Sequence, residues 1–407
     1  MSGISLLAGP DRNGPERFSD HMARLGPLPP DAPSLIDVLD RSGLRGCGGA
    51  AFPVAAKWRA VAAQHSGERV IVVNGAEGEP LSRKDRLLMQ VRPHLVLDGA
   101  MLAAETLRAE RVFLYLGAEH TGAVRAMTGA LQERSETDRR RTRLVTAPVG
   151  YVSGEESAAV HFINDGVALP TTTPPRPYQR GVGGRPTLIQ NAETLAHVAM
   201  IARFGADWFR QLGRSGSTGT ALLTVSGAVA AQTVIEVPQG VTLAEVVDAV
   251  GGTSARASAV LLGGYFGGWI AAEQAWDLHV DAASLKTGGH TLGCGVLAVL
   301  AASRCGVIES SRILTYLGDQ SARQCGPCVF GLRAIADAVH SVAARRADAN
   351  DIARVRRWAG VLGGRGACHH PDGAFGLLHS ALRVFAAEFS AHLERGRCTL
   401  DARAAAA

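Results

Sequence analysis

Three cysteines in the last quarter of the chain have types and spacing that suit metal binding. Cys325 and Cys328 are separated by two residues in QCGPCVFGLR, and Cys368 follows 40 residues after Cys328. Two thiolates at this gap can bind one metal centre together, and a third from a separate segment can close the site. Two buried structural thiols with an unrelated third are the alternative, and the spacing leaves both interpretations open.

A glycine-rich stretch, GLRGCGGAAFPVAAKW at residues 43–58, has the composition of a cofactor cradle. Four glycines fall within seven residues, and Lys57 lies in the helical pattern that follows. Backbone without Cβ atoms can approach a phosphate or a planar ring, and a helix N-terminus offers unpaired N–H groups to an anion. A tight turn with a purely structural purpose is the other interpretation.

Polar side chains follow a buried strand that the run VIVV predicts at residues 70–73. Asn74, Glu77 and Glu79 come directly after it. Strands of α/β domains deliver ligand-binding groups at their C-terminal ends. These three residues are therefore candidates for a binding site.

Two helix starts further along carry similar groups. Gly154, Glu155 and Glu156 open a helix within YVSGEESAAVHFINDG, and Asn191 and Thr194 lie around the start of another. Carboxylates in a first helical turn are ordinary complements of the helix dipole. The alternative is that the two carboxylates hold ribose hydroxyls or set the charge around a redox ring.

Composition excludes several classes of protein. The chain has 407 residues, 46% of them apolar, and no apolar run of about 18 residues that could span a bilayer. Its start lacks the pattern of a secretory signal, so we expect a cytoplasmic location. An odd number of cysteines, seven, argues against a disulfide framework. A net charge of +5, without basic residues interleaved with aromatics, argues against a nucleic-acid partner.

The elements that must position these groups alternate in the first half of the chain. Strands are expected at 70–73, 111–117 and 143–147, separated by helices at 94–108 and 121–134. This β-α-β-α-β order predicts a mostly parallel sheet with helices on its faces. A further helix is expected at 33–41.

The second half of the chain has two different patterns. Residues 220–300 contain short strand patterns, one helix at 242–250 and many glycines, which favours a small β-grasp-like module. From about Ile308 apolar residues recur at three- and four-residue spacing, which predicts a four-helix bundle.

Five ordered motifs make the chain resemble the flavin-carrying, NADH-oxidising subunit of respiratory complex I, which is the F-type subunit of NADH:quinone oxidoreductase. Matching flavoprotein subunits of soluble NAD-linked hydrogenases and formate dehydrogenases belong to the same family. The family patterns are G-L-R-G-R-G-G-A-G-F-P-x-G-x-K-W at 43–58, N-A-D-E-G-E-P at 74–80, K-D-R at 84–86, Y-x-C-G-E-E-T at 151–157 and G-x-P-T-x-x-N-N-V-E-T-L at 184–195. The resemblance covers roughly residues 34–398.

The resemblance implies a fold of class α/β plus α. It implies a Rossmann-like FMN and nucleotide domain at 33–212, a ubiquitin-like β-grasp domain of SLBB type at 215–303 and an iron–sulfur-type helical bundle at 305–400. Residues 1–32 are expected to be an irregular lead-in, and residues 401–407 a disordered tail.

The resemblance also implies FMN, a nicotinamide nucleotide and an iron–sulfur cluster as cofactors. Hydride transfer to the flavin would be followed by single-electron transfer to the cluster. Glu79 and Glu156 are the implied catalytic residues. The implied cofactor-binding residues are Gly46, Gly48, Phe52, Lys57, Asn74, Glu77, Tyr151, Gly154, Glu155, Asn191 and Thr194.

The chain departs from the family at the cluster. The family motif S-C-G-x-C-x-P-C places its first cysteine at Ala322, so only Cys325, Cys328 and Cys368 remain as ligands for a cluster that is 4Fe-4S in the family. A non-cysteine or exogenous fourth ligand, a three-iron cluster and no cluster are the alternatives. Asp319, His369 and His370 are nearby in sequence and could donate.

The nucleotide and flavin contacts also differ from the family. Ala60 takes the place of an aromatic residue, and Thr173-Pro174-Pro175-Arg176 replaces K-P-P-F. Each aromatic partner of the adenine is worth roughly 1 kcal/mol. Ala76 replaces an aspartate and Gln190 an asparagine. We therefore expect flavin binding to survive these changes better than tight NADH binding.

The preferred function is that of a divergent oxidoreductase subunit. It would pass electrons between NAD(P)H, bound FMN and an iron–sulfur centre or a ferredoxin-like redox partner. A partner in a membrane redox complex would place the protein at the inner face of the cell membrane. Two alternatives are an FMN-binding subunit that receives its electrons from a ferredoxin-like protein, and a non-catalytic assembly subunit with the same fold.

Overall fold

A computed structural model describes residues 5–10, 14–29, 35–65, 67–214, 216–347, 349–394, 396–398 and 400. The chain divides into two compact units. The first comprises Met1–Leu223 with Val234–Val241, and the second comprises Thr224–Thr233 with Thr242–Ala407. The tail at 401–407, which we expected to be disordered, lies outside the described residues.

A four-stranded parallel sheet forms the centre of the first unit, as the sequence predicted. Its strand order is β3-β2-β1-β4, and every neighbouring pair is parallel. The strands are β1 (Arg69–Gly75), β2 (Ala109–Gly117), β3 (Thr142–Ala147) and β4 (Thr187–Asn191). Because β1 pairs with both β2 and β4, it is the strand that brings the segments around residues 74 and 191 to one edge.

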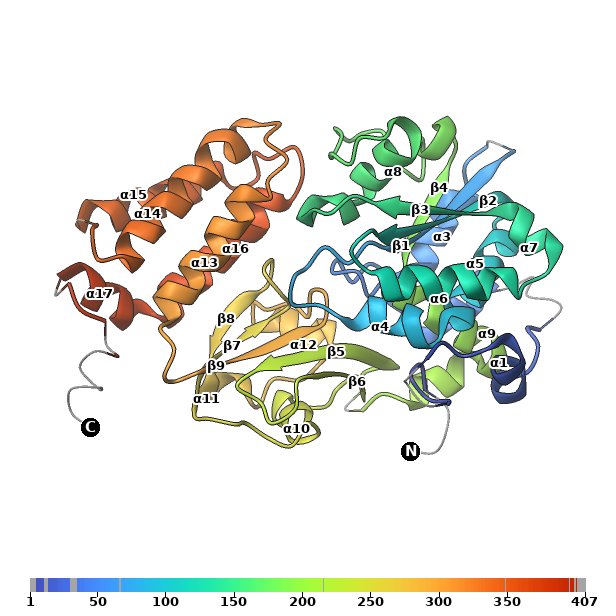
Figure 1. Cartoon of the computed structure of the whole chain (residues 1–407), viewed down its shortest axis with the longest axis horizontal. Helices are drawn as coiled ribbons and strands as arrows, with labels where there is room; N and C mark the ends of the chain where they lie inside the picture. The colour runs from blue at the N-terminus through green and yellow to red at the C-terminus, as the bar shows by residue number, and fades with distance from the viewer. Residues whose placement is uncertain are drawn as a thin grey trace. The chain divides into compact units, whose positions relative to one another are not determined.

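Side chains of β1 alternate between two apolar layers, as the pleat of a strand requires. Ile71 and Val73 join the core formed with helices α5 (Pro93–Thr106) and α9 (Ala192–Gln211). Val70 and Val72 join a smaller core that includes helix α8 (Glu156–Asp165). Figure 1 shows α8 on one side of this sheet and α4 and α6 on the other. Burial on both faces explains the uninterrupted apolar run of the strand.

The remaining helices of the first unit agree in position with those expected from the sequence. The helix expected at 33–41 is found from residue 35, and those expected at 94–108 and 121–134 end two residues early. Their bounds are α2 (Leu35–Ser42), α3 (Val54–Ala62), α4 (Lys84–Val91), α6 (Thr121–Gln132) and α7 (Glu136–Arg141).

The expectation of an irregular lead-in at 1–32 is wrong for part of that segment, because Phe18–Leu25 forms helix α1. The helix carries His21, which is fully buried and whose Nε2 lies 2.7 Å from Oδ2 of Asp98 on α5. Phe18 contacts the His94 ring, and Leu25 packs against the apolar core. Phe18, Met22 and Leu25 recur at helical spacing, but the run is only eight residues long and lies between Pro- and Gly-rich segments.

A five-stranded mixed sheet follows in the order β6-β5-β9-β7-β8. Strand β7 (Ala257–Leu262) is antiparallel to β8 (Gly268–Ala271) and to β9 (Val296–Ala301), and β5 (Thr220–Gly227) is parallel to β9. The other elements here are β6 (Thr233–Pro238), α10 (Leu243–Asp248), α11 (Ala272–Ala275) and α12 (Ala282–Thr287). Short strands around a helix near 242–250 were expected.

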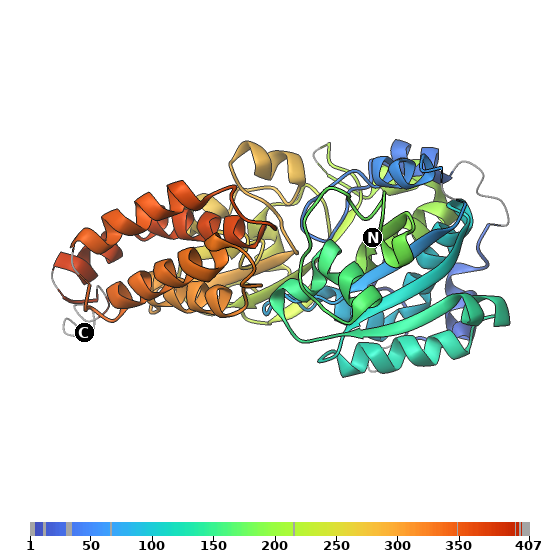
Figure 2. The same ribbon diagram turned by 90° about the horizontal axis from the view of Figure 1, so that it is seen from above.

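The second unit continues as helices to its described end, as predicted. Helix α13 packs against α14 and α16, and α14 also packs against α15; Figure 2 shows these helices in a second view. The elements are α13 (Gly306–Asp319), a π-helical segment (Pro327–Leu332), α14 (Arg333–Ala343), α15 (Ala349–Leu362), α16 (His370–Val384) and α17 (Ala386–Glu394). Within the described part of the chain, we find no helix with the length and apolar character needed to cross a membrane.

The buried carboxylate of Asp98 generates a prediction for the first unit. It accepts hydrogen bonds from His21, Arg134 and Arg203, and it is 1% exposed. Burial would raise the pKa of Asp98, but these partners outweigh burial and hold it well below its usual range. Asp98→Asn leaves two buried guanidinium groups without their counter-charge, so we expect a loss of about 3–5 kcal/mol in a urea unfolding titration at pH 7.

The matched control is Asp40→Asn, whose ion pair with Arg59 lies on the surface and should matter little. A similar loss in both variants would contradict the prediction.

Acid should destabilise the first unit, as Asp98→Asn does. Hydrogen bonds from His21 and Arg24 overcome burial and lower the pKa of Glu16 from 4.5 to about 2, so its stabilisation is present above pH 4.5 and lost as the pH falls toward 2.

Candidate functional site

The carboxyl ends of β1 and β4 bring two asparagines together. Asn74 and Asn191 are partners in the parallel register of these strands. The Asn74 amide donates to the Gly154 carbonyl at 2.8 Å, which joins the end of β1 to the turn before α8. The Asn191 side chain accepts from the Thr194 N–H at 3.3 Å and so caps α9. The sequence-predicted residues at 74, 154, 191 and 194 therefore lie at one edge of the sheet.

The glycine-rich loop is tied to the same edge. The Cys47 N–H donates to the Thr194 hydroxyl at 2.9 Å, which links the loop to the first turn of α9. A Cβ added at Gly48 would lie 3.3 Å from the Asn191 Cβ. At Gly46 the nearest atom would be a carbonyl oxygen 3.6 Å away. A side chain at position 48 would thus be in tight contact with Asn191.

Lys57 and Glu156 form an ion pair between α3 and the first turn of α8. The two side chains are 23% and 46% exposed, respectively. Solvent, and therefore a ligand, reaches both groups. The pair places one positive and one negative charge beside the glycine-rich loop and the Gly154 turn.

Glu79 and Tyr151 form a second polar pair at this edge. The Tyr151 hydroxyl donates to the Glu79 carboxylate at 3.0 Å. The backbones meet at the neighbouring Gly78, where an added Cβ would be only 2.8 Å from the Tyr151 carbonyl oxygen. Phe52, in the glycine-rich loop, is 55% exposed, which is unusual for an aromatic side chain of this size.

Two of the sequence-predicted carboxylates accept hydrogen bonds from groups within the protein. Glu77 accepts from the Ser82 hydroxyl at 2.7 Å and from the N–H groups of Asp85 and Arg86 at 3.0 Å, at the start of α4. Glu155 accepts from the N–H groups at 157 and 158 at 2.9 and 3.0 Å, and it caps α8. These bonds hold helix starts in place, so both side chains act by positioning their neighbours.

The three predicted metal ligands lie in the second unit, where Cys325 and Cys368 act on the Cys328 thiol, but the three Sγ atoms do not all lie within 4.8 Å of one another. Cys328 is buried at the π-helical segment, and Cys325 and Cys368 are half-buried. Burial, together with the adjacent Cys325 and Cys368 thiols, raises the pKa of Cys328 to about 12. A metal must therefore displace a proton from this thiol when it binds.

The three residues considered as extra donors have other partners. Asp319 pairs with Arg333 at 2.8 Å, and the His370 Nε2 lies 2.7 Å from the Leu317 carbonyl oxygen. His369 is almost fully exposed and lies beside Asp372, 3.6 Å away. Each would have to leave its partner in order to become a fourth ligand.

Comparison with known proteins identifies the family of this chain. Residues 39–200 match the model of the Nuo51 FMN-binding domain, and residues 309–392 match the NADH-ubiquinone oxidoreductase-F iron-sulfur binding region. The second F-type subunit of NADH-quinone oxidoreductase in Rhizobium meliloti is 31% identical over 92% of this chain and 91% of its own length. The chain belongs to the family of F-type subunits of NADH-quinone oxidoreductase. The resemblance that its motifs indicated is confirmed.

The chain is also similar to proteins of hydrogenases. The NADP-reducing hydrogenase subunit HndC of Solidesulfovibrio fructosivorans is 27% identical over 94% of this chain and 82% of its own length. The crystal structure of the NAD+-reducing [NiFe]-hydrogenase in the air-oxidized state aligns with a TM-score of 0.82 and 30% identity, covering 89% of this chain. This chain spans 63% of that hydrogenase chain. The mixed α/β fold with a parallel sheet is thus shared.

Sequence reasoning gave no role to a buried ion cluster beneath the family motifs. The Lys84 ammonium contacts Asp85 at 2.9 Å and Glu193 at 2.6 Å, and all three side chains are buried. Burial would raise the pKa of Glu193, but the Lys84 charge and His197 outweigh burial and lower it to about 2. One signal was available, because Lys84 is one of only three lysines in the chain.

The residues at this edge fit a flavin on observations of the structure itself. The Gln190 amide oxygen is buried and has no hydrogen-bond partner within the described part of the chain. The Gln190 amide group lies beside Gly46, whose added Cβ would be 3.9 Å from its nitrogen. A bound donor group would satisfy this acceptor, which otherwise costs stability. The exposed Phe52 ring and the accessible Lys57 charge suit a planar, phosphorylated ligand.

The contact at Gly78 yields a prediction. Gly78→Ala places a methyl group against two backbone carbonyl oxygens at 2.8 and 2.9 Å, which side-chain movement cannot relieve. We expect thermal and urea unfolding to show a loss of about 1–3 kcal/mol. Gly129→Ala in α6, where an added Cβ meets nothing within 4 Å, is the control and should be neutral or slightly stabilising. Equal stability of the two variants would show that the turns at 78 and 151 do not pack as described.

Proposed function

We propose that this chain is an electron-transfer subunit that takes electrons from NAD(P)H, through bound FMN, to an iron–sulfur centre or a redox partner. One observation carries the proposal. Within the segment that matches the FMN-binding domain, the glycine-rich loop, the ends of β1 and β4 and the Lys57–Glu156 pair converge at the carboxyl edge of one parallel sheet. Ligands of open α/β sheets bind at such edges.

We propose that the flavin lies against Gly46 and Gly48, with Lys57 as the cation for its phosphate or a ring carbonyl. Asn74 and Gly154 would line the end of β1, and the Gln190 oxygen would accept a hydrogen bond. When bound, FMN supplies two-electron exchange with a nicotinamide and one-electron exchange with a metal cluster. Glu77, Glu155, Asn191 and Thr194 hold the surrounding helix starts.

We propose that the nicotinamide nucleotide approaches the exposed side of this site. Phe52 offers an aromatic face, and Tyr151 holds the Glu79 carboxylate in position. Glu156 contributes a half-exposed negative charge, held near the flavin site by Lys57. Ala60, on α3, supplies no aromatic ring for an adenine. Binding of the nucleotide should accordingly be weak for the family.

In the second unit we propose Cys325, Cys328 and Cys368 as the ligands of the iron–sulfur centre, within the segment matching the iron-sulfur binding region. The five-stranded sheet would be the ubiquitin-like SLBB module, and helices α13–α17 would contain the cluster-bearing four-helix bundle. An iron–sulfur or ferredoxin-like protein would be the partner. Any membrane association at the inner face of the cell membrane would come through that partner.

A second candidate function is favoured because positions 60 and 176 carry alanine and arginine, which offer no aromatic ring to stack on an adenine. A ferredoxin-like protein would then deliver electrons to the flavin, and no adenine would need to stack. An assembly subunit without catalysis is less well supported, because it has no use for partly exposed, paired charges at the sheet edge such as Lys57 and Glu156.

Flavin binding tests the proposal first. Titration of the apoprotein with FMN, followed by quenching of flavin fluorescence, should give a saturable site of one equivalent. Lys57→Ala should weaken it at least tenfold, or about 1.4 kcal/mol, because the cation is lost from the site. The control is Lys286→Ala, which removes an exposed lysine on α12 and should bind FMN as the unchanged chain does. No binding by the unchanged chain would overturn the proposal.

The cluster generates a separate prediction at the position of the family's first cysteine. Ala322→Cys supplies a fourth thiolate, so we expect the reconstituted protein to lose iron to a chelator several-fold more slowly than the unchanged chain. Cys325→Ser should retain little iron and sulfide, whereas Cys294→Ser, outside the group, should retain them. If all four proteins contain the same iron and sulfide, these thiols do not bind the cluster.

A further inference from the structure

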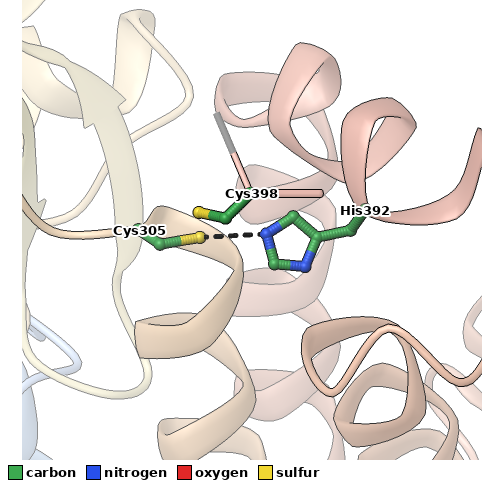
Figure 3. A group of neighbouring side chains, drawn as sticks. All are labelled: Cys305, His392 and Cys398. Atoms are coloured by element: carbon green, nitrogen blue, oxygen red, sulfur yellow. Dashed lines mark hydrogen bonds between the residues drawn. The ribbon is translucent and has the colours of Figure 1, made fainter. Parts of the chain in front are cut away.

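A second group of thiols lies in the helical part of the chain, separate from Cys325, Cys328 and Cys368. Cys305 directly precedes α13, His392 lies on α17, and Cys398 follows that helix. One ligand atom from each residue, the two Sγ atoms and an imidazole nitrogen, all lie within 4.8 Å of one another. Figure 3 shows the three side chains pointing toward a common point. All three residues are buried, at 4%, 2% and 3% exposure.

The His392 ring is oriented as a metal ligand would be. Its Nδ1 lies 3.2 Å from the Val342 carbonyl oxygen, which can only accept, so Nδ1 carries the proton. Nε2 therefore presents its lone pair, and it lies 3.4 Å from the Cys305 Sγ (Figure 3). Imidazoles that bind metals commonly donate their other N–H to a backbone carbonyl in this way. The hydrogen bond to Val342 thus fixes both the tautomer of His392 and the direction in which its Nε2 points.

We propose that Cys305, His392 and Cys398 form a second metal centre, which binds one Zn²⁺ ion and joins the segment after α17 to the start of α13. Two thiolates and one imidazole are a common zinc donor set. Glu388 lies next to Cys305, where its carboxylate accepts from the Gly306 N–H at 2.8 Å, but it is not part of the group within 4.8 Å. A water molecule would take the fourth position. Binding replaces the two thiol protons with the ion and releases both to solvent, without oxidation or reduction.

Location and chemistry separate this centre from the proposed electron-transfer site. Cys305 and Cys398 have no short-range sequence spacing, since they are 93 residues apart. The group closes only when α13 and α17 pack together with the segment beyond them. A centre of this kind contributes stability rather than electron transfer, because Zn²⁺ has no redox chemistry.

The test uses the full chain with the substitutions C325S, C328S and C368S, so that the proposed cluster ligands cannot bind the probe. Anaerobic titration with Co²⁺ should give one equivalent, with the strong near-ultraviolet and visible absorption of thiolate-bound tetrahedral cobalt. One equivalent of Zn²⁺ should abolish this absorption. Adding Cys398→Ser should remove it and weaken binding at least a hundredfold, whereas adding Cys294→Ser should leave it unchanged.

A measurement on the unchanged chain keeps the proposal testable if a variant fails to fold. Zn²⁺ should slow alkylation of Cys305 and Cys398 at least tenfold, read by peptide mass mapping, and leave Cys294 unaffected. The proposal is overturned if Co²⁺ binding survives Cys398→Ser, or if Zn²⁺ protects neither thiol. It is also overturned if mapping finds Cys305 and Cys398 joined as a disulfide in protein that was purified and loaded with Zn²⁺ anaerobically without a reductant.

Discussion

The parallel pairing of β1 with β4 places Asn74 and Asn191 opposite each other at the carboxyl edge of the sheet, and the proposed flavin site is built on that edge. Four segments far apart in sequence meet there: the glycine-rich loop, the turn after β1, the turn before α8 and the start of α9. Side-chain to backbone hydrogen bonds of Asn74, Asn191 and Thr194 hold them together. A slip of one residue in this pairing would turn the asparagine of the slipped strand to the opposite face and separate it from the other.

A cluster of buried charged side chains stabilises this edge of the sheet. The Asn191 amide donates to Asp85 at 2.7 Å, and Asp85 in turn contacts Lys84, which also binds Glu193. A buried ion set of this kind costs desolvation and is stable only while every partner remains. The same set therefore fixes the first turns of α4 and α9 in one arrangement. A cradle held in this way needs little reorganisation when a ligand binds.

Much of the fold was predictable because its signals are local. The apolar run at 70–73 and the alternation of strands and helices predicted the parallel sheet, and five ordered motifs indicated the family. Helix α1 was missed because its eight residues lie between Pro- and Gly-rich segments, and its contact with Asp98 is 77 residues away in sequence. The family motif predicted Glu77 as a ligand, but its two oxygens accept hydrogen bonds from the N–H groups at the start of α4, which the sequence does not reveal.

The group of Cys305, His392 and Cys398 shows the same limit more sharply. Cys325 and Cys328 were found from their two-residue gap, which is a signal within one segment. Cys305 and Cys398 come from separate segments, and the direction of the His392 ring depends on the Val342 carbonyl of a third helix. No local sequence pattern predicts that these three side chains lie close together, so the group is found only in the folded structure.

The most direct test of the central claim is an anaerobic absorbance spectrum of the protein loaded with FMN, iron and sulfide, recorded before and after NADH is added. We predict a bound-flavin band that bleaches within seconds, and a broad visible absorption from the cluster that decreases with it. A bound flavin that stays oxidised with NADH and NADPH, but bleaches with reduced ferredoxin, would contradict the nicotinamide as electron donor. A protein that takes up no flavin would contradict the proposed electron-transfer function as a whole.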